Sequence, residues 1–301
     1  MSVFVDRSSA VVIQGFTGQH ATFHAEDAIA NGTNVVGGVT PGKGGTTHLG
    51  LPVFDSVAEA VEETGANVSG IFAPPQVAID ALLEAIEAGI DVAVIIADGV
   101  PVQDMVRTKR YLAGRQTTII GPNSPGIITP GACKVGIMPS HIYTRGRIGV
   151  VSRSGTLNYE AVSQMSKLGL GQSTCVGIGG DPVNGTDFKT VLHAFENDDE
   201  TDVVVMIGEI GGQQEVEAAR WARQYMSKPL VAFVAGTSAP RGRRMGHAGA
   251  VINGDADTAT AKLDAIEALG HRTVRNPADI GDTVLRALKE IGDHPGGRRG
   301  A

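Results

Sequence analysis

Short apolar runs alternate with longer amphipathic stretches along most of the chain. Each apolar run is about four to six residues long, rich in Val and Ile, and bounded by glycine or polar residues. Such runs between helical segments are typical of parallel strands that are covered on both faces. The pattern therefore predicts two open α/β units in succession.

The first part of the pattern predicts a Rossmann-like unit over residues 1–122. Its expected strands cover residues 9–14, 34–39, 68–74, 91–98 and 117–122. Its expected helices cover residues 21–32, 57–65, 78–89 and 105–114. Residues 123–146 are rich in Pro and Gly and show no clear periodicity, which indicates a connector.

The alternation restarts and predicts a second, flavodoxin-like open parallel unit over residues 147–292. Its expected strands cover residues 147–152, 173–179, 202–209 and 229–235, and its expected helices cover residues 158–169, 187–198, 216–226, 258–270 and 279–292. The polar, glycine-rich tail, residues 293–301, is expected to be disordered. Open α/β sheets bind ligands beyond the carboxyl ends of their strands, so the informative residues are expected in the loops directly after the strands.

Composition limits the functions that the chain can have. Its 301 residues favour two domains, and its formal net charge of −7 argues against general nucleic-acid binding. No apolar run approaches the roughly 18 residues of a membrane span, and the N-terminus lacks the apolar core of a signal peptide. Cys133 and Cys175 lie far apart without ligand-like neighbours. They indicate buried thiols in a reducing cytoplasm, with no disulfide or zinc site.

Histidine spacing gives no metal site. His20 and His24 come closest, four positions apart, but no third ligand lies nearby in the sequence. We therefore expect this chain to bind no metal.

Two glycine-rich loops follow the first two predicted strands. Gly15 and Gly18 precede a helix, whose first N–H groups can approach a phosphate. The second strand leads into a loop with Lys43, a cation suited to a phosphate. A dinucleotide site would place an acid at the end of that strand to hold a ribose, and none is present. A phosphate-bearing ligand is therefore favoured, with ordinary turns and a solvated lysine as the alternative.

Three further strand-end features lie in the second half. Residues 154–156 (Ser-Gly-Thr) open a helix, where hydroxyls and N–H groups form either an anion site or an ordinary N-cap. Glu209 ends a strand between glycines, so its carboxylate is either solvated or aimed at a partner. His247 lies among small residues, just after three arginines within residues 241–244. An exposed imidazole in a positive field can act as a nucleophile toward a phosphoryl group, with Glu209 as the candidate acceptor for its other nitrogen.

Seven motifs occur in order over nearly the whole chain: GFTG, GGVTPGKGG, GPNSPGIITPG, SRSGTL, GIGGDP, GEIGG and RRMGHAGA. Together they resemble the α subunit of succinyl-CoA synthetase, the nucleotide-dependent succinate–CoA ligase. The resemblance implies a CoA-binding domain followed by a ligase domain. It also implies that His247 is the phosphorylated histidine and that Glu209 is its orienting carboxylate.

The resemblance assigns the remaining site residues position by position. For CoA it implies Gly15, Thr17, Gly18, Gln19, His20, Val39, Pro41, Lys43, Phe72, Pro74, Ile96, Ala97, Asp98, Asn123 and Ser124. On the substrate and phosphate side it implies Tyr159, Ser154, Gly155 and Thr156.

The resemblance also implies the reaction and a partner. ATP or GTP phosphorylates His247, the phosphoryl group passes to a carboxylate, and the CoA thiol displaces phosphate from the acyl phosphate. The nucleotide and its Mg²⁺ would be bound mainly by a separate β subunit with an ATP-grasp fold, in an αβ or an α2β2 assembly. This chain has no G-x-x-x-x-G-K-[ST] loop of its own. It is therefore expected to bind CoA alone and to turn over only with that partner.

Several positions depart from the family pattern on the CoA and acyl side. Ser124 stands where Cys is usual and Phe72 where Tyr is common, while His20 and the Ala97–Asp98 pair replace Gln and Thr-Glu. These changes leave the identity of the acid substrate open. Succinate is the expected substrate, and malate, itaconate or a sulfo-carboxylate such as sulfoacetate are the alternatives. Outside the ligases, a non-catalytic CoA-binding protein and a nicotinamide-dependent oxidoreductase are the alternatives.

Overall fold

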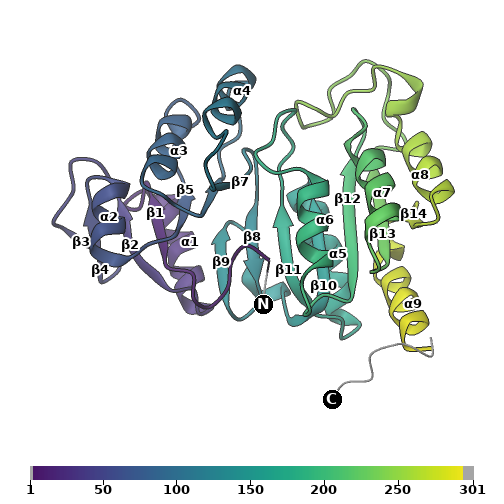
Figure 1. Ribbon diagram of the computed structural model, residues 1–301, viewed down its shortest axis with the longest axis horizontal. Coiled ribbons are helices and arrows are strands. Elements are labelled where there is room, and N and C mark those ends of the chain that lie inside the picture. The colour runs from purple at the N-terminus through teal and green to yellow at the C-terminus, as the bar shows by residue number, and fades with distance from the viewer. Residues whose placement is uncertain (1–2, 294–301) are drawn as a thin grey trace. The chain divides into compact units, whose positions relative to one another are not determined.

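A computed structural model describes residues 3–293, which divide into two compact units (Figure 1). The N-terminal unit comprises residues 3–140 and 176–186. The C-terminal unit comprises residues 141–175 and 187–293. The chain therefore returns to the N-terminal unit for one short segment before it completes the C-terminal unit.

The N-terminal unit contains a seven-stranded, mostly parallel sheet, a separate hairpin and helices. Its strands are β1 (Val11–Gln14), β2 (Val35–Val39), β3 (Thr47–His48), β4 (Leu51–Phe54), β5 (Val68–Ile71), β6 (Val92–Ile95), β7 (Thr118–Ile120), β8 (Gly126–Thr129) and β9 (Cys133–Gly136). Its helices are α1 (Gln19–Ala30), α2 (Val57–Thr64), α3 (Ala78–Glu87) and α4 (Val102–Tyr111). The last two strands, β8 and β9, form an antiparallel hairpin.

The first seven strands lie in the order β3-β4-β2-β1-β5-β6-β7, and only the β3–β4 pair is antiparallel. The chain leaves β1 toward β2 and later returns to its other side with β5, so a topological switch point lies between β1 and β5. Because the crossovers of parallel strands are right-handed, α2, α3 and α4 pack in sequence on one face and α1 covers the other. The Rossmann-like expectation is confirmed.

The C-terminal unit repeats the α/β alternation with a different strand order. Its strands are β10 (Arg145–Ser152), β11 (Gln172–Gly177, ending in the returning segment), β12 (Val203–Glu209), β13 (Leu230–Ala235) and β14 (Arg272–Val274). Its helices are α5 (Gly155–Lys167), α6 (Phe188–Glu196), α7 (Gln214–Tyr225), α8 (Ala259–Ala268) and α9 (Ile280–Asp293), and its 3-10 turns are η1 (Ser140–Ile142), η2 (Asp255–Asp257) and η3 (Pro277–Asp279).

The strands of the C-terminal unit lie in the order β11-β10-β12-β13-β14. This is the flavodoxin-like order, whose switch point falls between β10 and β12. The two strands are parallel, and Ser152 at the end of β10 lies opposite Ile207 of β12. All seven residues of β12 are buried, as expected for a central strand with helices on both faces. Residues just beyond β10 and β12 therefore sit where this fold places ligands.

The predicted elements are all present, with ends that shift by at most three residues. Four helices begin where a polar side chain caps them: Ser56 caps α2, Ser154 caps α5, Asp187 caps α6 and Thr258 caps α8. Such caps satisfy N–H groups that lack partners inside the helix. The position of α5, directly after β10, is thus set by the local sequence.

Residues 123–146 are not the irregular connector that the sequence predicts. They contain β8, β9 and the start of β10, and the N-terminal unit ends at residue 140 instead of 122. The hairpin strands have only four residues each, and they include Gly126 (φ 102°) and Gly136 (φ 129°). Only glycine adopts such angles readily, and these glycines obscured the strand periodicity. Of the expected tail, residues 293–301, only Asp293 lies within the described residues, as the end of α9.

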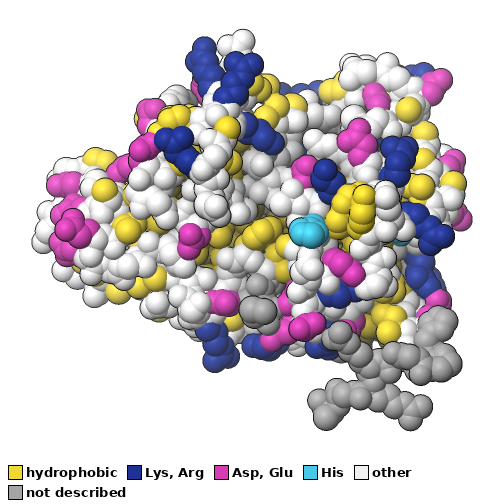
Figure 2. All heavy atoms as spheres, viewed as in Figure 1, with side chains coloured by type: hydrophobic (Ala, Val, Ile, Leu, Met, Phe, Trp, Pro, Cys, Tyr) yellow, Lys and Arg dark blue, Asp and Glu magenta, His cyan; other side chains and the backbone are white. Residues whose placement is uncertain are grey.

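The described surface is mixed in charge. Lys and Arg side chains gather over α4, whose last turn carries Lys109 and Arg110 (Figure 2). Among residues 3–293, no helix is long and apolar enough to cross a membrane.

Candidate active site

Arg153 and Glu209 meet at the switch point of the C-terminal unit. Arg153 follows β10, and its N–H donates to the Ile207 carbonyl of β12 at 3.1 Å. Glu209 is the last residue of β12. The Arg153 Nε lies 3.1 Å from the Glu209 Oε1, and the two side chains are only 5% and 8% exposed. The strand ends thus bury an ion pair at the edge of the sheet where ligands bind.

The His247 imidazole contacts the other oxygen of the same carboxylate. Its Nδ1 lies 2.6 Å from the Glu209 Oε2. A carboxylate only accepts hydrogen bonds, so Nδ1 carries the proton and, in the neutral ring, Nε2 carries the lone pair. The His247 side chain is 26% exposed. A buried acid therefore orients a ring that remains partly accessible, as the sequence predicts for a nucleophilic histidine.

Glycines bring the loop of His247 against the end of β12. Gly211 has a φ of 89°, and a Cβ added there would lie 2.2 Å from the Gly249 carbonyl oxygen. The loop is closed by bonds from the Met245 N–H to the Ala250 carbonyl at 3.0 Å and from the Ala250 N–H to the His247 carbonyl at 3.1 Å. Any side chain at Gly211 would push this loop outward.

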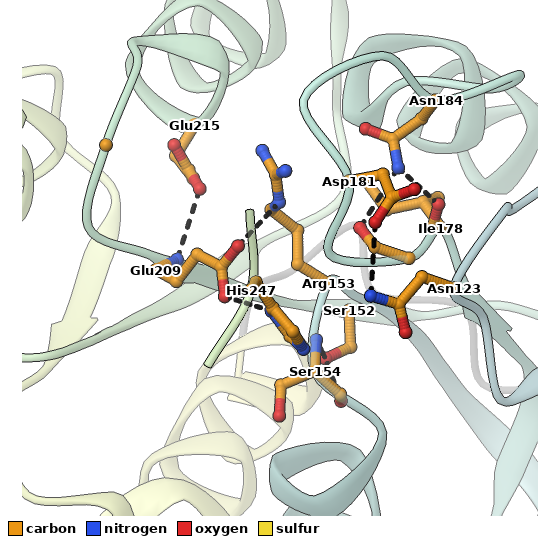
Figure 3. Close-up of polar contacts among 12 residues, drawn as sticks. Asn123, Ser152, Arg153, Ser154, Ile178, Asp181, Asn184, Glu209, Glu215 and His247 are labelled. Atoms are coloured by element: carbon orange, nitrogen blue, oxygen red, sulfur yellow. Dashed lines mark hydrogen bonds and ion pairs between the residues drawn. The ribbon is translucent and has the colours of Figure 1, made fainter. Parts of the chain in front are cut away.

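The start of α5 lies in the direction in which His247 points. The Ser154 hydroxyl accepts the Leu157 N–H at 3.3 Å, and the Ser152 hydroxyl accepts the Ser154 N–H at 3.1 Å. In the view of Figure 3, the imidazole points from Glu209 toward Ser154. The first N–H groups of a helix and its dipole favour an anion. The arrangement can therefore stabilise negative charge carried by the histidine.

Tyr159 lies on α5, one turn after its start. Its side chain is partly buried, and burial raises the pKa of its hydroxyl. The phenol therefore stays protonated at neutral pH and is available as a hydrogen-bond donor.

The positive charge beside the acid comes from a residue that the sequence did not single out. Arg241, Arg243 and Arg244 are all exposed, and Arg241 forms an ion pair with Asp255. It is Arg153 that contacts the carboxylate of the site. The signal was its position inside the SRSGTL motif, directly after a strand.

Most of the expected CoA residues lie at one edge of the N-terminal sheet. Residues 15–20 follow β1 and residues 39–43 run on from the end of β2, while residues 72–74 follow β5 and residues 96–98 follow β6. These four strands are adjacent and parallel, so their carboxyl ends share one edge. The fold therefore brings together loops that are scattered over the first hundred residues.

At this edge, the loops after β1 and β2 form a candidate phosphate-binding site. The Lys43 Nζ donates to the Thr17 Oγ1 at 2.9 Å. Helix α1 begins after Gly18 without any side-chain cap, so its first N–H groups face no capping oxygen. Gly15 has a φ of 76°, and a Cβ there would lie 2.8 Å from the Phe72 carbonyl oxygen. A lysine and an uncapped helix start thus meet just beyond β1, the strand that borders the switch point.

Asn123 also reaches this edge, although it belongs to the stretch expected to be a connector. Its N–H donates to the Ala97 carbonyl at 2.8 Å. Its amide Nδ2 donates to the Asp181 Oδ1 at 3.1 Å (Figure 3). Asp181, in the returning segment, was not among the expected site residues.

Two expected CoA residues have side chains turned into the protein. Ser124 is 3% exposed; its hydroxyl donates to the Gly177 carbonyl at 2.5 Å and accepts the Gly126 N–H at 2.9 Å. Val39 is 1% exposed, and its carbonyl accepts the Gly15 N–H at 2.9 Å. Both side chains therefore shape the loops from within the N-terminal unit.

No group of three or more His, Cys, Asp or Glu side chains suited to a metal ion occurs within residues 3–293. Cys133 and Cys175 are buried free thiols. Burial raises the pKa of Cys133 to about 12 and that of Cys175 well above its usual value, so both remain protonated.

Two family models match the chain, one in each unit. The model described as CoA binding domain matches residues 6–99, and the model described as CoA-ligase matches residues 151–271. The first range contains the Gly15 and Lys43 loops, and the second contains Arg153, Glu209 and His247.

Curated relatives match over almost their whole length. The succinate–CoA ligase [ADP-forming] subunit α of Staphylococcus aureus (strain Mu50) is 54% identical over 292 residues, which is 97% of both chains. The protein of the same name from Staphylococcus epidermidis (strain ATCC 12228) is 52% identical over the same share of each chain.

Solved structures share the fold. ATP citrate lyase from Methanothrix soehngenii, solved with citrate and coenzyme A, superposes with a TM-score of 0.86 at 27% identity and covers 99% of this chain. The chain spans 53% of that lyase chain. An acetyl-coenzyme A synthetase from Ca. Korarchaeum cryptofilum superposes with a TM-score of 0.71 at 18% identity, over 92% of this chain and 60% of its own.

Proposed function

Because the chain belongs to the family of succinate–CoA ligase α subunits, we propose that it joins succinate to CoA while ATP is cleaved to ADP and phosphate. The reaction passes through a phosphohistidine at His247 and an acyl phosphate. The observation that carries this proposal is the 2.6 Å contact between His247 Nδ1 and Glu209 Oε2. It fixes the tautomer in which Nε2 is the nucleophilic atom.

Each step has a defined bond change. Nε2 attacks the γ-phosphorus of ATP, the bond to ADP breaks, and Glu209 balances the positive charge of the phosphorylated ring. A succinate carboxylate oxygen then attacks the phosphorus, and the Nε2 electron pair returns to the ring. The CoA thiol releases its proton to solvent, the resulting thiolate sulfur attacks the acyl carbon, and the C–O bond to phosphate breaks. Three easier transfers thus replace one difficult condensation.

The chain's own residues divide between two substrates. Lys43, Thr17 and the uncapped start of α1 bind the phosphates of CoA, with residues 72–74, 96–98 and 123 beside them. In the other unit, the N–H groups at the start of α5 hold the phosphoryl group, and Tyr159 donates to the acyl substrate.

The nucleotide is bound by a β subunit with an ATP-grasp fold, in an αβ or α2β2 assembly. No group of three or more His, Cys, Asp or Glu side chains suited to a metal ion occurs within residues 3–293. Mg²⁺ would be held with the nucleotide by the β subunit, where it would neutralise phosphate charge. ATP is favoured over GTP because the curated relatives are named ADP-forming. Two buried free thiols fit a reducing cytoplasm as the place of action.

The proposal is tested by reconstituting the chain with a succinate–CoA ligase β subunit. ATP labelled at the γ-phosphate should label the α chain, and the label should be acid-labile and base-stable. His247→Asn should abolish labelling, whereas His193→Asn, at an exposed histidine on α6, should leave it intact. Labelling of His247→Asn, or CoA binding by the wild type without any phosphoenzyme, would rule out this function.

The same reconstituted pair identifies the acid. Release of ADP and of GDP is followed with succinate, malate, itaconate and sulfoacetate, each with CoA present. Succinate with ATP should give the highest kcat/KM. A higher value for another acid would keep the chemistry but change the substrate.

A further inference from the structure

A buried ion pair lies directly behind the carboxylate that contacts His247. Lys262 of α8 and Glu215 of α7 are both fully buried, with Nζ 2.6 Å from Oε2. Buried pairs of this kind are often no more stable than apolar side chains of similar volume. Stability alone therefore does not account for the pair, and its contacts with neighbouring groups become informative.

The pair holds the backbone of Glu209 from both sides. The Glu209 N–H donates to the Glu215 Oε1 at 3.2 Å. The Lys262 Nζ donates to the Glu209 carbonyl at 2.8 Å and to the Gly211 carbonyl at 2.7 Å. With Glu215 Oε2 as third acceptor, all three ammonium hydrogens are used. Figure 3 shows Glu215 above the Glu209 backbone, while the Glu209 carboxylate extends to the right, between Arg153 and His247.

The neighbouring glycines leave little room for this arrangement to shift. A Cβ at Gly208 would lie 2.3 Å from the Glu215 Cγ. A Cβ at Gly211 would lie 2.2 Å from the Gly249 carbonyl oxygen, in the loop of His247. The segment from Gly208 to Gly211 is thus packed between the ion pair and the loop that carries the histidine.

We propose that Lys262 and Glu215 are positioning residues for phosphoryl transfer, which act through Glu209. By fixing the Glu209 backbone, they keep its Oε2 on the His247 Nδ1 and so keep Nε2 aimed at the phosphorus. The inference rests on the proposed function. A displacement of about 1 Å can slow a reaction on the order of a hundredfold, so a clamp on this carboxylate has a large effect on rate.

The first test is Glu215→Gln, which keeps the shape and removes the charge. In the pair with the β subunit, the single-turnover rate of His247 phosphorylation should fall on the order of tenfold or more. The KM for CoA should stay unchanged, because Glu215 lies in the other unit. The matched control is Asp27→Asn, which removes the carboxylate paired with a second buried lysine, Lys134. This control should phosphorylate at the wild-type rate.

Two further measurements separate positioning from a structural role. In a Glu209→Gln background, Glu215→Gln should cause no additional loss of phosphorylation rate, because the group it positions is already disabled. Lys262→Met combined with Glu215→Leu removes both charges, so it should be more stable than Glu215→Gln, in which Lys262 keeps an uncompensated buried charge, and it should still lose the rate.

The inference is overturned if folded Glu215→Gln phosphorylates like the wild type, or if its loss is the same in the Glu209→Gln background. Absence of phosphohistidine in the wild type would instead refute the proposed function, so the two failures are distinguishable.

Discussion

Arg153 and His247 share one carboxylate: the Nε of Arg153 lies 3.1 Å from the Glu209 Oε1, and the Nδ1 of His247 lies 2.6 Å from Oε2. The side chains of Arg153 and Glu209 are both buried, while the His247 side chain is partly exposed. The accessible ring is thus anchored on a buried pair of opposite charges.

Arg153→Met should strongly destabilise the C-terminal unit. Removing one partner of a buried ion pair leaves an uncompensated charge and costs about 3–5 kcal/mol in the free energy of unfolding. Arg145→Met is the matched control, because Arg145 pairs with Glu200 at side-chain exposures of 57% and 38%. Its expected cost is about 0–1 kcal/mol. Denaturant unfolding measures both, and equal losses would contradict the expectation.

Ser154→Ala should affect both stability and phosphorylation. Loss of an N-cap costs about 0.5–2 kcal/mol in the free energy of unfolding. Ser56→Ala removes the comparable cap of α2, where the hydroxyl accepts the Glu59 N–H at 3.2 Å. Both variants should lose similar stability, but only Ser154→Ala should slow the labelling of His247. A slower rate in Ser56→Ala would show that the loss is not local to α5.

Lys43→Ala should weaken CoA binding by the isolated chain. A hydrogen bond to a charged group contributes about 1.5–3 kcal/mol, which corresponds to a rise in Kd on the order of tenfold to a hundredfold. Arg107→Ala, in the same unit with a side chain 74% exposed, should leave the Kd unchanged. Calorimetric titration with CoA at two salt concentrations gives both values. Unchanged affinity in Lys43→Ala would remove this loop from the CoA site.

Gly15→Ala should destabilise the protein more than Gly32→Ala, although the two glycines have similar φ angles. Gly32 has a φ of 88° and open space where a Cβ would lie, whereas a Cβ at Gly15 would meet the Phe72 carbonyl. Gly32→Ala should therefore cost only the backbone strain of about 1–2 kcal/mol. Gly15→Ala should cost more and also weaken CoA binding. Thermal melting and the same titration compare the two variants, and identical effects would argue against the close approach.

The two thiols should resist alkylation in the native protein. Burial raises the pKa of Cys133 to about 12 and that of Cys175 well above its usual value. At pH 8, below both raised values, the thiols are protonated, and the protonated form is unreactive. Iodoacetamide should modify neither cysteine until denaturant is added, as mass spectrometry would show. Rapid native modification of either one would refute this.

The local pattern was sufficient for much of the fold. Apolar runs and helical periods located the principal strands and helices, and the polar residue before α5 marked its start. Some of the short strands escaped, among them β3 and β8, because so few positions show no clear period. The glycines Gly126 and Gly136 also hid the hairpin strands from the sequence analysis. Both have positive φ angles, and glycine at such positions is typical of a turn as well as of a strand that bends.

The sequence by itself determined which side chains follow which strands, and through its motifs it marked His247 and Glu209. Only the tertiary structure decided what stands around them. Lys262 carries a charge, and lysines are rarely buried, yet it lies on the buried face of α8 with Leu263 and Ile266 and contacts Glu215 and the Glu209 carbonyl. Contacts of this kind depend on strand order and helix packing, which bring distant segments together, and no local pattern of residues records them.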